Sequence, residues 1–176
     1  KPVDPGKLQG YDYDYINSDI INNHMKTENG KLVLPSGQSY KIMLLPDRDD
    51  MAAEVLKSLE KLIADGAIVI GRKPIRSNSL KNYPQCDNEV MALADKIWGK
   101  CDGKTALSNK YGKGTVHWGK SVKQVLDELK ITPDFEVKGI DNSHRHIDYI
   151  HQKTEEEDIY FVSNSAKEKK KITCVF

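Results

Sequence analysis

The chain has 176 residues, of which 38% are apolar and 30% charged, as expected for a globular protein and not for a disordered tail. Its 27 basic and 26 acidic residues give a formal net charge of +1, which excludes the strongly basic surface of a typical nucleic-acid-binding or anionic-membrane-binding protein. No apolar run approaches the roughly 20 residues of a membrane-spanning helix. We therefore expect a folded domain with neither a nucleic-acid nor a membrane partner.

The first fifty residues predict a short helix and a hairpin. Residues 11–16 (YDYDYI) alternate aromatic and acidic side chains, and Asn17 is a suitable N-cap for a short helix that ends near Met25. Residues 32–34, a Pro-Ser-Gly turn and residues 40–45 then follow the pattern of a hairpin. The second of these strand segments is apolar enough to be buried on both faces.

Helices and strands alternate in the next part of the chain. Residues 51–65 place their apolar side chains on one helical stripe that Gly66 ends, and residues 67–70 (AIVI) form a second buried strand. The same reasoning predicts a helix at 87–98, a strand at 115–118 and a helix at 122–129. We therefore assign residues 1–135 to a three-layer, doubly wound α/β domain of the flavodoxin-like or glutamine-amidotransferase-like type. Trp98 and Trp118, each at the end of such an element, are predicted core anchors.

The periodicity changes after Pro133. Residues 147–151, 159–162 and 172–176 resemble strands and have no helix between them, which is typical of antiparallel hairpins. We assign residues 136–176 to a short antiparallel β segment. Such a small sheet is marginally stable alone, so it either packs back on the α/β domain or begins a β-sandwich.

The usual signatures of nucleotide binding and nucleophilic catalysis are missing. The loop after the first buried strand reads RDD at 48–50, where a phosphate site needs a glycine-rich turn. None of the three cysteines lies in a G-x-C-x-G elbow or a CxxC pair. We predict no catalytic nucleophile, cofactor or metal, and leave open whether Cys86 and Cys101 form a disulfide or stay buried free thiols.

Two polar segments are candidate sites with structural alternatives. Asp12 and Asp14 could act as acid and base or accept hydrogen bonds from sugar hydroxyls while the neighbouring tyrosines stack on the ring; the alternative is a structural loop packed on the first helix. His144, His146 and Asp148 could share one side of an extended segment as metal ligands, but a metal site needs further ligands from elsewhere in the chain, so we expect a surface loop.

Several motifs together resemble glycoside hydrolase family 106, the α-L-rhamnosidase-type enzymes. These are GYDYDYINSDII, GKLVLPSGQSYKIMLLPD, DGAIVIGRKPIRSNSL, YPQCDNEV, GKGTVHWGKSVKQVL and DYIHQKTEEEDIYFVSN, which extend from Gly10 to Asn164. The resemblance implies that a catalytic (β/α) barrel precedes this α/β domain and that β-sandwich domains follow it. It also implies removal of terminal L-rhamnose from plant-type oligosaccharides outside the cytoplasm. The chain itself begins at Lys1 without a signal peptide, as expected for a processed product or an excised piece.

The resemblance also limits the functional prediction. Glycoside hydrolysis needs two carboxyl groups across the scissile bond, and these are expected on the barrel, so we assign no catalytic residue here. The matching motifs imply five substrate-binding residues, which are Tyr13, Asp14, Tyr15, Asn17 and His151. Gln152 departs from the arginine that usually follows this histidine.

Three hypotheses follow. The first is a non-catalytic accessory domain whose partners are the barrel and β-sandwich domains of the same polypeptide, and which is inactive by itself. The second is an independent carbohydrate-binding module, which requires exposed tyrosines at positions 11, 13 and 15. The third is an amidotransferase-like enzyme, which the absence of an elbow disfavours and which would need an unusually reactive cysteine.

Overall fold

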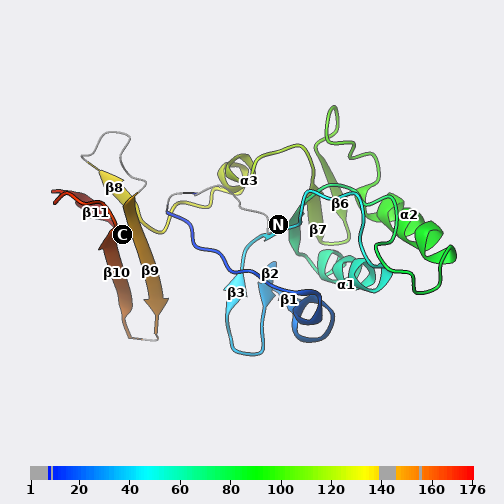
Figure 1. The fold of residues 1–176 in the computed structure, drawn as a ribbon, viewed down its shortest axis with the longest axis horizontal. Helices are drawn as coiled ribbons and strands as arrows, with labels where there is room; N and C mark the ends of the chain where they lie inside the picture. Colours follow the sequence, from blue (N-terminus) through cyan, green and yellow to red (C-terminus); the bar gives the residue numbers. More distant parts are fainter. Residues whose placement is uncertain (1–7, 9, 139–145, 155) are drawn as a thin grey trace. The chain divides into compact units, whose positions relative to one another are not determined.

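The computed structural model of the chain describes residues 8, 10–138, 146–154 and 156–176 (Figure 1). These residues form two compact units. Unit 1 contains Tyr15–Leu129, and unit 2 contains residues 8 and 10–14 together with Lys130–Phe176. The segment around Tyr11 was predicted as part of the α/β domain, whereas its contacts group it with the C-terminal segment.

Unit 1 begins with a helical turn and a small antiparallel sheet. The turn, η1 (Ile20–His24), is a π-helix that directly follows Asp19. The predicted cap residue, Asn17, lies two positions further back, and its side-chain oxygen accepts a hydrogen bond of 3.0 Å from the Ile20 N–H. Three strands follow in the order β1–β2–β3, and their bounds are Lys26–Glu28, Lys31–Val33 and Ser39–Tyr40. The hairpin predicted around Pro-Ser-Gly is therefore present, with an additional first strand.

The predicted strand at residues 40–45 is divided between two sheets. Tyr40 ends β3, whereas β4 (Met43–Leu44) belongs to a separate four-stranded sheet of order β4–β5–β7–β6. In that sheet β5 (Ile68–Ile70) pairs in parallel with both β4 and β7 (Gly114–His117), as predicted. The edge strand β6 (Ser108–Tyr111) is antiparallel to β7 and was not predicted, because its sequence SNKY is largely polar.

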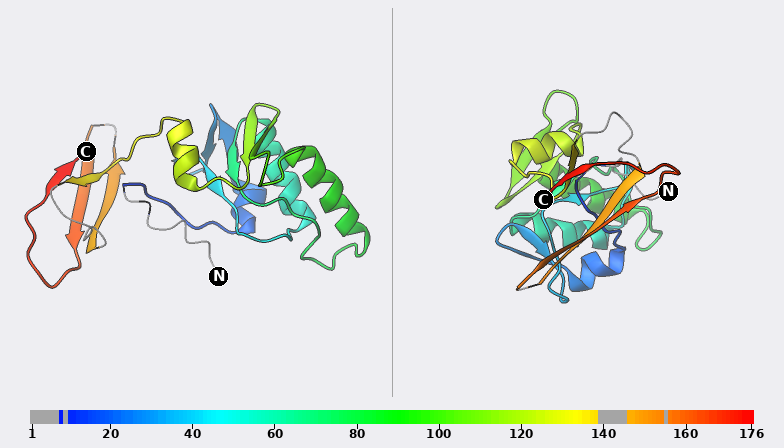
Figure 2. Two further views of the ribbon diagram at one scale, coloured as in Figure 1. Left: turned by 90° about the horizontal axis from the view of Figure 1, so that it is seen from above. Right: turned by 90° about the vertical axis from the view of Figure 1, so that its left-hand side faces the viewer.

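Helices lie on both sides of this sheet (Figures 1 and 2). Helices α1 (Ala53–Ala64) and α2 (Gln85–Trp98) pack on each other and on one face, and α3 (Val122–Glu128) lies on the other. Helix α3 starts with a capping box in which the Ser121 hydroxyl accepts from the Gln124 N–H. The flavodoxin-like assignment of this arrangement stays a prediction.

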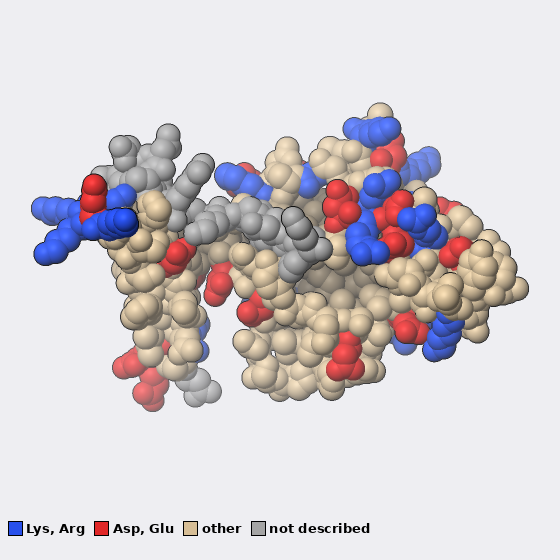
Figure 3. Space-filling view, in the orientation of Figure 1, with Lys and Arg blue, Asp and Glu red and all other residues tan. Residues whose placement is uncertain are grey.

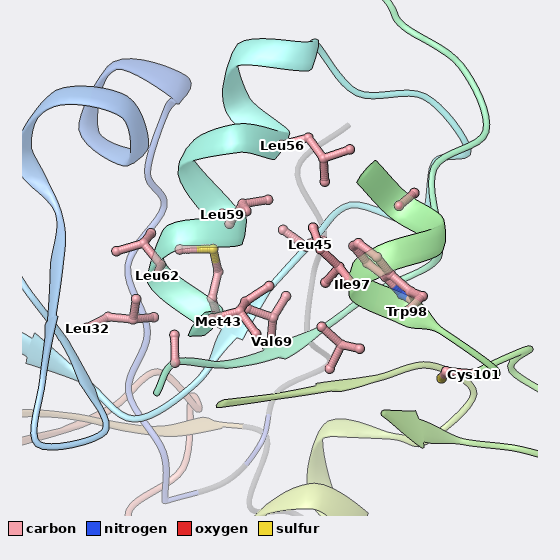
Figure 4. Packing of buried hydrophobic residues seen from close by; sticks show 14 of the residues in the cluster. Leu32, Met43, Leu45, Leu56, Leu59, Leu62, Val69, Ile97, Trp98 and Cys101 are labelled. Atoms are coloured by element: carbon pink, nitrogen blue, oxygen red, sulfur yellow. The ribbon is translucent and has the colours of Figure 1, made fainter. Parts of the chain in front are cut away.

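The core of unit 1 lies between the sheet and helices α1 and α2. Leu56, Leu59 and Leu62 of α1 are all buried and belong to this core cluster (Figure 4). Trp98 is fully buried, and its indole N–H donates a hydrogen bond of 3.1 Å to the Gly71 carbonyl oxygen. Trp118 is partly buried and packs against the same cluster. Both tryptophans are therefore core residues, as predicted.

All three cysteines are free thiols in the structure. Cys86 is buried at the start of α2 and lies 3.5 Å from the Ser79 carbonyl oxygen, to which its S–H can donate. Cys101 is also buried, and burial raises the pKa of its thiol. Of the two alternatives left open by the sequence, the free thiols are observed.

Unit 2 consists of two small antiparallel sheets. Strands β9 (Ile147–Lys153) and β10 (Asp158–Asn164) form the predicted hairpin. Strand β11 (Thr173–Val175) pairs with β8 (Glu136–Lys138), a short strand that was not predicted. The C-terminal strand is thus paired with residues just after Pro133 and not with the hairpin.

Tyr11 and its neighbours hold the start of unit 2 in place. The Tyr11 hydroxyl donates a hydrogen bond of 2.9 Å to the Ile131 carbonyl oxygen, and the Asp134 N–H donates one of 2.7 Å to the Gly10 carbonyl oxygen. Tyr11 therefore has a structural contact within unit 2.

On the face of unit 1 drawn in Figure 3, basic and acidic side chains lie next to one another, mainly over its upper right part. Several are paired, including Lys96 with Glu60 at 2.6 Å and Lys57 with Glu89 at 2.5 Å. Within the described part of the chain, no helix has both the length and the apolar character needed to cross a membrane.

Candidate functional site

The five predicted substrate-binding residues are shared between the two units. Tyr13, Asp14 and His151 belong to unit 2, whereas Tyr15 and Asn17 belong to unit 1. The side chains of Tyr13 and Tyr15 are exposed, as an aromatic surface for sugar stacking requires. The Asn17 side-chain oxygen accepts a hydrogen bond from the Ile20 N–H at the start of η1, which gives Asn17 a structural contact.

His151 lies at the centre of a polar group that we call the histidine cluster, formed by Asp134, His151, Lys153, Asp158 and Tyr160. The His151 Nδ1 atom lies 2.8 Å from Asp134 Oδ2, and its Nε2 atom lies 2.9 Å from Asp158 Oδ1. Only 18% of the histidine side chain is exposed. Both ring nitrogens are therefore engaged by carboxylates from different segments of unit 2.

The hairpin itself positions most of this cluster. Side chains alternate between the two faces of a strand, so His151 and Lys153 share one face of β9. The register places Tyr160 opposite His151 and Asp158 opposite Lys153. As a result the His151 and Tyr160 rings stack with centroids 4.0 Å apart and planes 10° from parallel.

Charge holds the cluster together. The Lys153 ammonium lies 2.9 Å from both Asp158 oxygens, and Lys153 together with His151 lowers the pKa of the Asp158 carboxyl group. Ionised carboxylates only accept hydrogen bonds, so the His151 ring donates to Asp134 and Asp158 together only when both of its nitrogens are protonated.

Aromatic rings form the base of the cluster. The Tyr160 hydroxyl donates to Asp134 Oδ1 at 3.2 Å, and burial together with the nearby Asp134 charge raises the Tyr160 pKa. Phe135 stacks on Tyr149 at 4.7 Å between centroids, and Phe176 approaches Tyr160 at 4.5 Å. These rings therefore pack against one another within unit 2, next to the carboxylate of Asp134.

Asp134 and Tyr160 were missed by the sequence analysis. The alternation of β9 and β10 could have identified Tyr160, because a hairpin closed near residues 154–157 pairs it with His151. No local signal identifies Asp134, which is 17 residues from His151 and reaches it through tertiary contact. The proposed metal-ligand group contains His144, which lies outside the described residues. Among the described residues, no group of three or more His, Cys, Asp or Glu is arranged to hold a metal ion.

A second feature is a cavity of about 110 Å³ in unit 1 at the N-terminal ends of α1 and α2. Its lining includes Lys57, Ser79, Lys81 and Cys86. Both lysines are paired with glutamates, and small-molecule sites usually have volumes of at least about 300 Å³. This cavity is therefore a weaker candidate than the histidine cluster.

Comparison with known proteins assigns the chain to a family. The alpha-L-rhamnosidase family, glycoside hydrolase family 106, matches residues 3–176. A Formosa agariphila protein named "Putative beta-glucuronidase" is 38% identical over 170 residues, which are 97% of this chain and 13% of that protein. A solved rhamnosidase structure from Novosphingobium sp. PP1Y matches 94% of this chain and 15% of its own chain, with 27% identity and a TM-score of 0.83. The chain therefore belongs to glycoside hydrolase family 106, as its motifs indicated.

Proposed function

We propose that this chain is a non-catalytic accessory α/β domain of a large glycoside hydrolase of the rhamnosidase type. The main support for the proposal is that the match with the rhamnosidase structure covers very different shares of the two chains. Almost the whole of this chain has a counterpart there, yet the counterpart is only 15% of that enzyme. The catalytic carboxyl pair, the barrel that holds it and the β-sandwich domains then belong to other parts of the polypeptide.

As part of this function, we propose that residues 11–17 contact the substrate. The exposed rings of Tyr13 and Tyr15 support this role, because tyrosine combines an apolar face with a polar hydroxyl. His151 contributes through the histidine cluster, whose carboxylates are 40% and 45% exposed at Asp134 and Asp158. The substrate class is a plant-type oligosaccharide that ends in L-rhamnose, cleaved outside the cytoplasm. Unit 1, with helices on both faces of its sheet, is proposed to be flavodoxin-like.

An independent carbohydrate-binding module is the second candidate, and the same two exposed tyrosines favour it. Tyr11, the third ring that this hypothesis requires, is only partly exposed, and its hydroxyl is bound to the Ile131 carbonyl oxygen. Two of the three cysteines, Cys86 and Cys101, are buried, which disfavours them as the reactive thiol of an amidotransferase-like enzyme.

The mass of the native gene product, detected with an antibody to this chain, separates the first two candidates. We expect a product far larger than the 19.9 kDa of this chain, with activity on an aryl rhamnoside. A product of about 19.9 kDa would contradict the accessory-domain proposal. Titration of the chain itself with rhamnose-containing oligosaccharides would then test the binding module.

A further inference from the structure

His151 joins two separate segments of unit 2. Its Nε2 atom faces Asp158, which lies on β10 in the same hairpin, whereas its Nδ1 atom faces Asp134, which lies just before β8. The Asp134 backbone N–H is bound in turn to the Gly10 carbonyl oxygen, and β8 pairs with β11. The contact between His151 and Asp134 therefore connects the hairpin with the β8–β11 sheet.

The number of hydrogen bonds that the His151 ring can donate depends on its charge. A neutral imidazole has one N–H donor and one nitrogen lone pair, whereas the protonated ring has two N–H donors. Both ring nitrogens face carboxylate oxygens, at 2.8 Å for Asp134 and 2.9 Å for Asp158. In the neutral ring one lone pair therefore points at a carboxylate oxygen, and a repulsive contact replaces an attractive one.

Other side chains around the ring are of types that ordinarily keep their charge between about pH 5 and 9. They are Lys153 and Tyr149 of β9, Asp158 and Tyr160 of β10, Asp134 before β8, and Asp12, whose charge acts on Tyr149. Lys153 and His151 lower the pKa of Asp158, and burial raises the pKa of both tyrosines. Histidine is the residue type that ordinarily titrates inside this range, so a change of charge in the cluster is assigned to His151.

We propose that protonation of His151 controls how firmly the β9–β10 hairpin is held in unit 2. In the protonated form both ring N–H groups donate, and both carboxylates are bound. As the pH rises and the ring loses its proton, one of the two contacts is lost. Either loss loosens the hairpin, because Asp158 links β10 to β9 and Asp134 links the hairpin to the segment before β8. The hairpin is therefore held more firmly below neutral pH than above it.

Hydrogen exchange of the full-length gene product, followed peptide by peptide with mass spectrometry, tests this proposal. Exchange itself depends on pH, so the rate of each variant is divided by the rate of the parent at the same pH. His151→Gln has no ionisable ring. We expect it to accelerate exchange of the β9 and β10 peptides, by a factor at least about fivefold larger at pH 5.5 than at pH 8.5. Peptides of α1 should keep the parent's rate, which shows that unit 1 remains folded.

Two further variants separate protonation from other causes. Asp158→Asn offers an amide N–H to the lone pair of the neutral ring, but only a weaker acceptor to the protonated ring. We expect its hairpin peptides to exchange faster than those of the parent at pH 5.5 and no faster at pH 8.5. His146→Gln replaces an exposed histidine of the same unit, and its rate relative to the parent should be the same at both pH values.

Three results would overturn the proposal. If His151→Gln accelerates exchange by the same factor at both pH values, the ring has a structural role that does not depend on its proton. If Asp158→Asn loosens the hairpin equally at both pH values, repulsion between a ring lone pair and a carboxylate is not the cause. If His146→Gln reproduces the effect of His151→Gln, the pH dependence does not arise in the histidine cluster.

Discussion

The imidazole of His151 stacks on the ring of Tyr160, with centroids 4.0 Å apart, while the carboxylate of Asp134 contacts both residues. The register of the hairpin aligns the two rings. Asp134, which lies just before β8, contacts both residues through its carboxylate oxygens. The same carboxylate thus joins the hairpin to the rest of unit 2. This relationship makes Asp134 the most informative position at which to perturb the cluster.

We expect Asp134→Asn to loosen the hairpin. The amide has no charge to offer His151, and the loss of a charge-assisted hydrogen bond at a half-exposed site costs about 1 kcal/mol. Hydrogen exchange of β9 and β10 amides should accelerate about fivefold for that loss. The control is Asp95→Asn, which removes an exposed partner of Lys73 in unit 1 and should leave these amides unchanged. Equal exchange in both variants would contradict the role of Asp134.

Gly10 is predicted to be intolerant of a side chain. It has a φ of +84°, and a Cβ atom there would overlap the Phe135 carbonyl oxygen and lie 2.7 Å from Pro133 Cβ. Gly10→Ala should therefore expose unit 2 to proteolysis, at a cost of about 2 kcal/mol or more. Gly37→Ala is the matched control, since Gly37 has a similar φ of +90° and no atom within 4 Å of its added Cβ. Similar protease sensitivity in the two variants would show that backbone strain, and not the contact with Phe135, decides the outcome.

Leu59 should be a major source of stability in unit 1. It is fully buried between α1 and the sheet, so Leu59→Ala removes apolar contacts and leaves a cavity. We expect the free energy of unfolding to fall by about 2–5 kcal/mol. Urea unfolding followed by tryptophan fluorescence measures this loss, because both tryptophans of the chain lie in unit 1. Leu80→Ala makes the same chemical change at an exposed site and should stay within about 0.5 kcal/mol of the parent chain.

Local periodicity explains which parts of the fold could be predicted. The helix at 53–64 and the strand at 68–70 are encoded by apolar spacing that can be read within a dozen residues. Strand β6 could not be recognised this way, because SNKY is polar and forms a strand by pairing with β7. Nor could β8, whose three residues find a partner 35 or more residues away in β11.

The candidate site was predictable only in part, for a related reason. His151 was predicted through the family resemblance. The face of β9 on which it lies can be read from the alternation of its neighbouring residues. Asp134 and Phe176 reach the cluster from segments on either side of the hairpin, so their positions depend on tertiary packing. Tyr11 shows the converse case: its sequence context suggested a sugar platform, but a contact 120 residues away with Ile131 holds it within unit 2.

The buried side chain of His117 should make the stability of unit 1 depend on pH. It is the last residue of β7, it is 7% exposed, and no described residue bonds its Nδ1 atom. Burial and the nearby Lys120 lower its pKa below the ordinary value of 6.5, against a smaller opposing effect of Glu128. Below pH 6.5 the unfolded chain therefore binds a proton that the folded chain does not, so the free energy of unfolding falls as the pH decreases.

Urea unfolding by tryptophan fluorescence at pH 7 and at pH 5.5 measures this dependence. We expect the parent chain to lose stability between the two, and His117→Gln to lose less, because glutamine does not titrate. His24→Gln makes the same replacement at an exposed histidine of the same unit and serves as the comparison. If the His117 and His24 variants follow the same pH profile, carboxylates elsewhere, and not the buried imidazole, account for the loss of stability.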